Sequence, residues 1–195
     1  MLALSGCASP VKTVQGGTIG RIVTVSEWGG TAADESKART HTVSRITLHH
    51  QGEAFVRGRD PAEYLRSLQA WSRAARKWLD IPYHYVVDLD GTVYAGRDIR
   101  FAGDTNTEYD PAGHASIEVV GNYEDAEPTQ AQLDALVELM TMLATKYRIA
   151  PESIRGHKDV SEQTLCPGKN LYRYLENGYF REQVGRNLPS QYAAE

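Results

Sequence analysis

The spacing of apolar residues predicts a first amphipathic helix that begins near residue 60. Asp60 followed by Pro61 is typical of a helix start, because aspartate caps free backbone N–H groups and proline fits the first helical position. The apolar positions that follow recur every three or four residues, which predicts that one face of this helix is buried. These positions are Leu65, Leu68, Trp71 and Ala75.

A longer helix is predicted after Thr129, where apolar residues form one continuous stripe at helical spacing. A short final helix is predicted at residues 171–175. The stripe of the long helix comprises Leu133, Leu136, Val137, Met140, Leu143, Ala144 and Tyr147.

Runs rich in β-branched residues predict strands between these helices. Residues 43–50 (VSRITLHH) form one such run, and residues 115–120 (ASIEVV) form another. Residues 153–155 are predicted to form a short strand. A hairpin is predicted from residues 82–89 and 92–95, because the intervening Asp90-Gly91 is a strong turn signal.

The order of these elements is strand, helix, hairpin, strand, helix, strand, helix. This order predicts the α/β class, with a single domain in which a central mixed β-sheet is flanked by helices. The predicted domain spans residues 22–185. Residues 1–21 are interpreted as a leader and tether, and residues 186–195 as a C-terminal tail. Residues 8–42 lack periodicity, so their later part is expected to form an arm that lies across the domain.

Composition and charge narrow the class of protein. The 195 residues are 41% hydrophobic and 24% charged, which is ordinary for a globular domain. The net charge of −4 provides no basic surface for nucleic acid, so no nucleic-acid partner is expected. No apolar run approaches the ~20 residues that a membrane-spanning helix needs.

The N-terminus carries a pattern that resembles a lipoprotein. Leu4-Ser5-Gly6-Cys7 matches the small-residue pattern that precedes lipid attachment in bacterial lipoproteins. The six residues before Cys7 contain neither the basic nor the apolar region of an export signal. Either an upstream start supplies that signal, or the match is chance within a tail. The first alternative predicts a periplasmic, lipid-anchored or secreted protein, and the second a cytoplasmic one.

Three side chains carry the main candidate chemistry. His157 and Cys166 lie nine residues apart on a segment stiffened by glycine and proline, and His49 and His50 end an apolar run far upstream. Two histidines and one cysteine make three protein ligands, which leave the fourth corner of a tetrahedral zinc open for water. Open sites of this kind are catalytic, whereas structural zinc sites are closed by a fourth side chain.

Each of these residues also has a structural interpretation. A single histidine in a strand is more often a hydrogen-bonded core or surface residue, and we interpret His41 and His84 in this way. Cys166 could instead be buried as a small apolar residue. A zinc site that only stabilises the fold would need a fourth ligand, such as His50 or His114.

Glu118 is a polar exception in an apolar strand. Ile117 precedes it, and Val119 and Val120 follow it. A buried carboxylate without a partner is costly. The residue therefore either points to solvent on an open face or lines the site as a base, and the residues alone leave both alternatives open.

Several motifs recur together in one known family. They are Ser26-Glu27-Trp28-Gly29, Ile46-Thr47-Leu48-His49-His50, Asp80-Ile81-Pro82-Tyr83-His84-Tyr85, Asp90-Gly91-Thr92-Val93-Tyr94, Gly96-Arg97, Gly156-His157-Lys158-Asp159 and Thr164-Leu165-Cys166-Pro167-Gly168. In these segments the chain resembles the type-2 class of zinc-dependent N-acetylmuramoyl-L-alanine amidases. That family includes the peptidoglycan recognition proteins and zinc-dependent phage lysozymes. The resemblance covers residues 22–176.

The resemblance implies roles for individual residues. In the family the first histidine of the pair binds zinc, which assigns this role to His49, and His157 and Cys166 complete the metal triad. Tyr83 matches the tyrosine whose hydroxyl contacts the zinc-bound water or the reacting carbonyl. Thr164 takes the position held by threonine in active recognition proteins and by lysine in phage enzymes.

The resemblance extends to two further residues. The spacing from Glu118 to Gly121 matches the glutamate that some bacterial members place beside the zinc, which favours the site-lining alternative. His114, four positions earlier, is a candidate for substrate contact. The segment Ala102-Gly103-Asp104-Thr105-Asn106 departs from the Gly-Ala-His that many recognition proteins carry there.

The resemblance implies a Zn²⁺-dependent hydrolase that cleaves the amide bond between N-acetylmuramic acid and L-alanine in peptidoglycan or its fragments. A monomer acting on peptidoglycan or muropeptides is expected. The main alternative is a peptidoglycan receptor with the same fold and no turnover. Such relatives typically lose the cysteine ligand, so the presence of Cys166 favours the enzyme. Another alternative is a cytoplasmic amidase that recycles anhydro-muropeptides.

Overall fold

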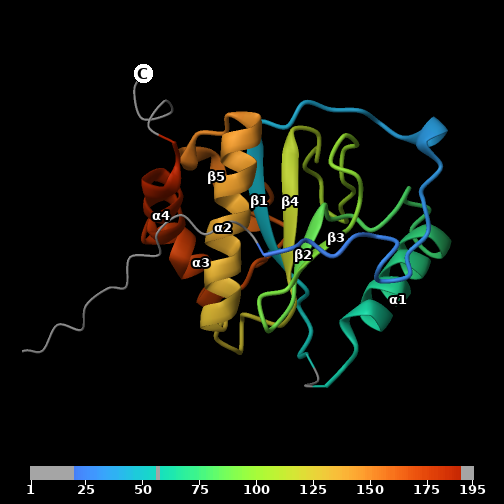
Figure 1. The fold of residues 1–195 in the computed structure, drawn as a ribbon, viewed down its shortest axis with the longest axis horizontal. Helices are drawn as coiled ribbons and strands as arrows, with labels where there is room; N and C mark the ends of the chain where they lie inside the picture. Colours follow the sequence, from blue (N-terminus) through green and yellow to red (C-terminus); the bar gives the residue numbers. More distant parts are fainter. Residues whose placement is uncertain (1–19, 56–57, 190–195) are drawn as a thin grey trace, which may run out of the picture.

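The computed structural model describes residues 20–55 and 58–189 of the chain (Figure 1). The lipoprotein-like pattern at Cys7 lies outside the described residues, so lipid attachment stays a prediction. Within the described part, no helix is long and apolar enough to cross a membrane.

A five-stranded mixed sheet forms the centre of the molecule, as predicted (Figure 1). Strands β1, β2, β4 and β5 run parallel, and β3 pairs antiparallel with β2 at one edge. The strand order is β3-β2-β4-β1-β5. The strands span Arg45–His50 (β1), Tyr85–Val87 (β2), Val93–Ala95 (β3), His114–Val119 (β4) and Ile154–Gly156 (β5).

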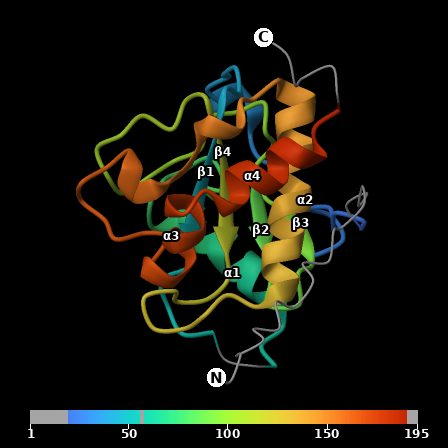
Figure 2. The same ribbon diagram turned by 90° about the vertical axis from the view of Figure 1, so that its left-hand side faces the viewer.

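Helices cover both faces of this sheet. Helix α1 lies on one face, while α2, α3 and α4 lie on the other (Figures 1 and 2). The predicted α/β architecture is therefore confirmed. The α-helices span Pro61–Ala74 (α1), Gln130–Tyr147 (α2), Lys169–Glu176 (α3) and Tyr179–Asn187 (α4), and short 3-10 helices span Glu35–Lys37 (η1), Pro151–Ser153 (η2) and His157–Asp159 (η3).

Strand alternation divides the interior into two cores. In β1, Ile46 and Leu48 pack into the larger core beneath α2 and α4. The residues between and after them, Thr47 and His49, are also buried and face the opposite side, where α1 lies. In β4, Glu118 is in register with His49 and therefore shares that side. The polar face of the sheet thus lies beneath α1.

Local signals in the sequence account for the helix starts and for the hairpin. The Asp60 side chain accepts a hydrogen bond from the N–H of Ala62, and Thr129 forms a capping box with Gln132 at the start of α2. The predicted hairpin is present as β2 and β3. Its turn differs in detail, because the N–H of Gly91 bonds to the carbonyl of Asp88 and Gly91 follows the turn with φ +85°.

The prediction for the buried face of α1 is wrong in part. Leu65 is fully buried, but Trp71 is 46% exposed and Ala75 is also exposed. The helix instead buries polar residues toward the sheet, including Gln69, whose amide bonds to Asp80 and to the backbone of Thr31. The apolar residues Leu68 and Trp71 instead line a cleft beside the helix.

Two further features lie around the domain. Residues 20–42 form an arm across the sheet edge, as predicted, with hydrogen bonds from Val23 to both Val93 and Ala95. The indole of Trp28 on this arm is buried and donates to the carbonyl of Ala95. Helix α4 was not predicted. It buries Phe180 and Val184 in the larger core and ends at Asn187, two residues beyond the expected domain end.

Candidate metal centre and its cleft

Three predicted ligands meet on the α1 side of the sheet. One ligand atom from each of His49, His157 and Cys166 lies within 4.8 Å of the other two. The Cys166 Sγ is 3.7 Å from Nδ1 of His49, and the rings of His49 and His157 are 4.6 Å apart between centroids. Among residues 20–55 and 58–189, no fourth histidine, cysteine, aspartate or glutamate joins this group.

The pairing of parallel strands explains how distant residues converge. His49 comes from the end of β1, and Leu48 before it is in register with Gly156 of β5. His157 directly follows Gly156, so the two imidazoles leave neighbouring strands at the same edge of the sheet. Cys166 is brought close because its carbonyl accepts a 2.8 Å hydrogen bond from the N–H of Lys158.

The donor set fits zinc. With Zn–S of about 2.3 Å and Zn–N of about 2.0–2.1 Å, sulfur and nitrogen ligands at a tetrahedral angle lie about 3.6 Å apart. The observed 3.7 Å between Cys166 Sγ and His49 Nδ1 matches that edge. His157 uses its Nε2 atom to contact Thr107, so its Nδ1 remains free for a metal. Two imidazoles and one thiol with one open corner therefore suit a catalytic zinc.

The electrostatics of the three groups are consistent with this assignment. Burial lowers the pKa of His49 well below its usual value, and it lowers the pKa of His157 to about 4. Both rings are therefore neutral at pH 7 and can offer a lone pair. Burial raises the pKa of the Cys166 thiol to about 12. That thiol loses its proton at neutral pH only when a cation stabilises the thiolate, as a coordinated metal does.

His50 is not part of the ligand cluster. Its backbone N–H points to Cys166 Sγ at 3.4 Å, and its Nδ1 accepts a 3.3 Å hydrogen bond from the N–H of Tyr123. The closed structural zinc site considered from the sequence therefore lacks its fourth protein ligand among the described residues.

Glu118 lies next to this centre, in register with His49 across β1 and β4. It is buried at 2% exposure, and burial raises the pKa of its carboxyl to about 8. The hydroxyl of Tyr64 on α1 donates a 2.9 Å hydrogen bond to its Oε1 atom, while Oε2 has no protein partner in the described part of the chain. Of the two alternatives left by the sequence, Glu118 takes the site-lining one.

Tyr83 and Thr164 line the same cleft as the three ligands. The Tyr83 ring lies 5.1 Å from that of His49, and burial raises the pKa of Tyr83 well above its usual value, so its hydroxyl stays a donor. Thr164 accepts a 3.0 Å hydrogen bond from the N–H of Cys166 and so shapes the ligand loop. Its hydroxyl proton remains available for another acceptor.

His114 is placed differently. It is 3% exposed, and its Nδ1 lies 2.5 Å from the Thr47 hydroxyl. The Tyr109 ring lies 5.1 Å from the His114 ring and 5.0 Å from the His157 ring, and it is tilted to both. His114 does not line the cleft that the other predicted residues share. Its burial argues against direct substrate contact, which stays an untested prediction. His41 and His84 are hydrogen-bonded to backbone groups through both ring nitrogens, as expected of structural histidines.

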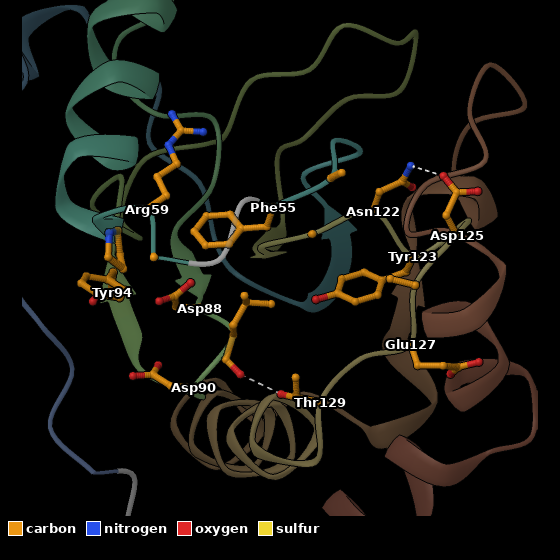
Figure 3. A pocket seen from close by; sticks show the side chains of 16 residues that line it. Phe55, Arg59, Asp88, Asp90, Tyr94, Asn122, Tyr123, Asp125, Glu127 and Thr129 are labelled. Carbon is orange, nitrogen blue, oxygen red and sulfur yellow. Dashed lines mark hydrogen bonds between the residues drawn. The ribbon is translucent and has the colours of Figure 1, made fainter.

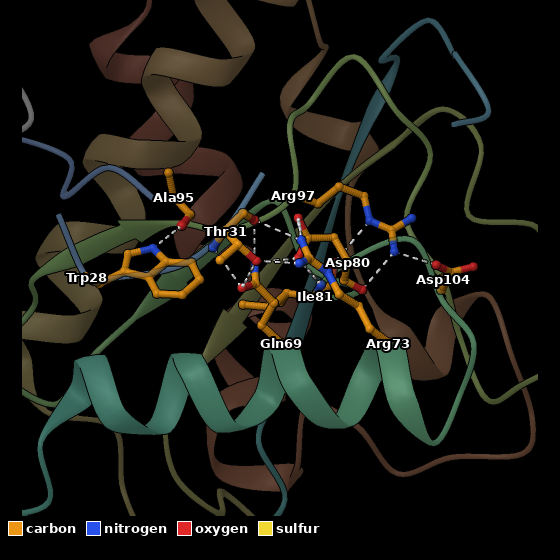
Figure 4. A network of polar contacts seen from close by, with 9 residues as sticks. All are labelled: Trp28, Thr31, Gln69, Arg73, Asp80, Ile81, Ala95, Arg97 and Asp104. Carbon is orange, nitrogen blue, oxygen red and sulfur yellow. Dashed lines mark hydrogen bonds and ion pairs between the residues drawn. The ribbon is translucent and has the colours of Figure 1, made fainter. Parts of the chain in front are cut away.

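Thr107, which was not predicted as a site residue, orients His157. Oγ1 of Thr107 lies 2.8 Å from Nε2 of His157 and fixes the ring. Thr107 sits on the loop after Asp104, and this loop is anchored by the buried guanidinium of Arg97 (Figure 4). Arg97 also donates to the carbonyls of Asp80, Ile81 and Ala102. No local motif predicts these contacts, because they join segments that are distant in sequence.

The metal ligands open onto a cleft of about 560 Å³. Its lining includes Ser67, Leu68 and Trp71 of helix α1 and the loop at residues 104–107. This volume lies within the usual range of small-molecule sites, and all three ligands line it. Its lining also includes Glu118, Tyr83 and Thr164.

Comparison with known proteins shows the family of the chain. The family model described as N-acetylmuramoyl-L-alanine amidase matches residues 39–169. The chain is 28% identical over 165 residues to peptidoglycan recognition protein 1 of Mus musculus, covering 83% of this chain and 90% of that protein.

Two solved structures are similar over the same region. The crystal structure of Drosophila peptidoglycan recognition protein SD has a TM-score of 0.67 at 28% identity, covering 80% of this chain and 93% of that one. A structure of recognition proteins LCa and LCx, in which tracheal cytotoxin is bound to their ectodomain complex, has a TM-score of 0.69 at 25% identity, covering 80% and 94%. Because the family model spans more than half of the sequence, the chain belongs to the type-2 N-acetylmuramoyl-L-alanine amidase and peptidoglycan recognition protein family.

Proposed function

We propose that this protein is a zinc-dependent hydrolase that cleaves the amide bond between N-acetylmuramic acid and L-alanine in peptidoglycan or its fragments. The observation that carries the proposal is the three-ligand cluster of His49, His157 and Cys166, which opens onto a cleft beside the carboxyl of Glu118. An open three-ligand set leaves a position for water or substrate on the metal, and a buried carboxyl of raised pKa beside it is a candidate acid–base group.

The bound metal would act as a Lewis acid on the carbonyl and would lower the pKa of a water molecule. The protein's own residues supply the remaining functions. With its pKa near 8, Glu118 is largely protonated at pH 7 and can give a proton to the departing amine nitrogen. In its ionised form it accepts a proton from the attacking water. Tyr64 holds this carboxyl in place through the hydrogen bond to Oε1.

Two hydroxyls can stabilise negative charge on the reacting oxygen. Tyr83 stays protonated because it is buried, and it lies beside His49. Thr164 lines the same cleft and keeps one hydroxyl proton free. Donors fixed in position before reaction are most effective in a water-poor site. Thr107 contributes indirectly by holding the His157 ring in one orientation.

A second candidate function is peptidoglycan binding without turnover. It is favoured by the names of the similar proteins, which are recognition proteins, and by the tracheal cytotoxin held in one similar structure. The thiol of Cys166, buried against two imidazoles, favours the enzyme, because a pure receptor has no need of an open metal site.

The deciding experiment incubates the zinc-loaded protein with a defined muramyl tripeptide and analyses the products by mass. The expected result is free peptide with a new L-alanine amino terminus, with none from Cys166→Ala. Substrate binding by both proteins without any cleavage by the wild type would establish the receptor function instead.

A further inference from the structure

A second cavity, of about 780 Å³, lies at the carboxyl ends of β2 and β4, between the starts of α1 and α2 (Figure 3). Arg59 lines both this cavity and the metal cleft, so the two adjoin. We call it the Asp88 pocket, after the residue that follows β2. Parallel sheets commonly bind ligands outside the carboxyl ends of their strands.

Asp88 places a buried carboxyl group in this pocket. It is 7% exposed, and its Oδ1 atom is buried without a hydrogen-bond partner in the described part of the chain. Burial and the neighbouring Asp90 raise the pKa of its carboxyl. A buried acceptor without a partner costs free energy, which a ligand with a hydrogen-bond donor would recover.

The other acidic side chains of the lining already have partners. Asp90 accepts from the N–H of Thr92, Asp125 accepts from the Asn122 amide at 2.9 Å, and Glu127 pairs with Arg173. Asp88 is therefore the acidic side chain with an uncommitted, buried oxygen.

Asp88 faces the same side of the sheet as the metal ligands. His49 is in register with Glu118, and Glu118 is in register with Val86. Asp88 lies two residues beyond Val86, so strand alternation directs it to the same face. Strands spaced about 4.8 Å apart, with a rise of about 3.3 Å per residue, place the Cα atoms of His49 and Asp88 roughly 12 Å apart. A short oligosaccharide spans that distance.

The lining indicates a neutral ligand that is rich in hydroxyl groups. Tyr94 and Phe55 flank Asp88, and Tyr123 lies across the cavity (Figure 3). Aromatic rings offer apolar faces to the C–H surfaces of sugars, while a carboxylate accepts hydrogen bonds from their hydroxyls.

Two other ligand classes fit less well. A metal ion would need several oxygen ligands, and no group of three or more histidine, cysteine, aspartate or glutamate side chains gathers here among the described residues. An organic cation would meet Arg59 and the positive N-terminal ends of α1 and α2, which begin at Pro61 and Gln130.

We infer that the Asp88 pocket is a saccharide subsite, which binds sugars of the glycan strand next to the muramic acid whose amide is cleaved. This inference rests on the proposed function and extends it. It assigns the protein a substrate class, namely glycan strands longer than one sugar, in preference to isolated muramyl peptides.

The first arm of the test compares kcat/KM for a muramyl tripeptide with that for a glycan tetrasaccharide carrying the same tripeptide. Wild type should prefer the tetrasaccharide at least about tenfold, the size expected from one hydrogen bond to a charged group. Asp88→Ala should bring this ratio close to one. Asp134→Ala removes a charge from the exposed face of α2 and should keep the wild-type ratio.

The second arm needs no variant and no turnover. Wild-type protein is titrated with di-N-acetylchitobiose and, separately, with 1-aminopentane, while backbone amide signals are followed by NMR. The inference requires the sugar to shift the signals of Asp88 and Tyr94. Shifts with the amine alone, or with neither compound, would overturn it.

The two arms separate this inference from the proposed function. Failure to hydrolyse either muropeptide contradicts the hydrolase, and the sugar titration then decides the pocket by itself. Equal hydrolysis of both muropeptides by the wild type supports the hydrolase and contradicts the saccharide subsite.

Discussion

Nε2 of His157 lies 2.8 Å from the hydroxyl of Thr107, a residue 50 positions earlier in the chain. This contact leaves Nδ1 of His157 as the metal-binding atom and connects the ligand to the loop that Arg97 anchors. A ligand histidine held in this way has little rotational freedom to lose when it binds a metal.

Thr107→Val should therefore weaken zinc binding while leaving the fold intact. Loss of a partner of this kind typically costs 10- to 100-fold in metal affinity. Competition with a chromogenic chelator measures the change. Thr141→Val on α2 is a matched control, because the Thr141 hydroxyl donates to the carbonyl of Val137 in its own helix, away from the metal ligands. Equal affinities for both variants would show that Thr107 does not support the ligand.

Glu118→Gln should lower kcat for muramyl tripeptide hydrolysis by at least ~100-fold, the usual size of an acid–base contribution. Zinc content should be unchanged, because Glu118 is not among the three clustered ligands. The exposed Glu63 on α1 provides the control Glu63→Gln, which should behave as wild type. A loss of only two- to threefold would make Glu118 a structural residue.

Arg97→Lys should destabilise the fold and loosen the loop at residues 104–107. The guanidinium is 4% exposed and donates to three backbone carbonyls as well as to Asp104. An ammonium cannot reproduce this planar set of donors, so acceptors are left unpaired at a cost of about 2–4 kcal/mol. Urea unfolding measures the loss. A midpoint within error of the wild type would contradict the anchoring role.

Stability should fall below pH 6.5 partly because of His84. Its Nδ1 accepts from the N–H of Ser116 and its Nε2 bonds to the carbonyl of Phe101, so the folded state requires the neutral ring. Burial lowers the pKa of His84 from 6.5 to about 4. The unfolded chain thus binds a proton between these values while the folded chain does not, and stability is lost as the pH falls through this window.

The measurement for this prediction is urea unfolding of the metal-free protein at pH 7 and pH 5. With the pKa values above, His84 accounts for roughly 2 kcal/mol of the decrease between the two. In His84→Gln, which does not titrate, the decrease should be smaller by about that amount, although the variant is less stable at pH 7. An identical decrease in both proteins would exclude His84 as a source of the pH dependence.

Much of the fold could be predicted because its signals are local. The Asp60-Pro61 start of α1, the stripe of α2 and the turn at Asp90-Gly91 depend on residues close in sequence. The buried face of α1 could not be predicted in this way. Gln69 is buried because Thr31 and Asp80 satisfy its amide, and both partners come from other segments.

In the candidate site, too, local signals could be predicted and contacts between distant segments could not. The spacing of His157 and Cys166 indicates a metal site, while the choice of His49 over His50 depends on the family resemblance. The roles of Tyr64 and Thr107 depend on contacts with Glu118 and His157 across 54 and 50 residues, which no pattern in the sequence encodes. The Asp88 pocket likewise becomes visible only when β2, β4 and α2 are assembled.

X-ray absorption at the zinc edge of the reconstituted protein tests the metal centre most directly. One zinc per chain is expected, with a single sulfur at about 2.3 Å and nitrogen or oxygen ligands at about 2.0–2.1 Å. In Cys166→Ala the sulfur shell should disappear. A wild-type protein that retains no zinc, or whose zinc has no sulfur ligand, would contradict a centre built from His49, His157 and Cys166.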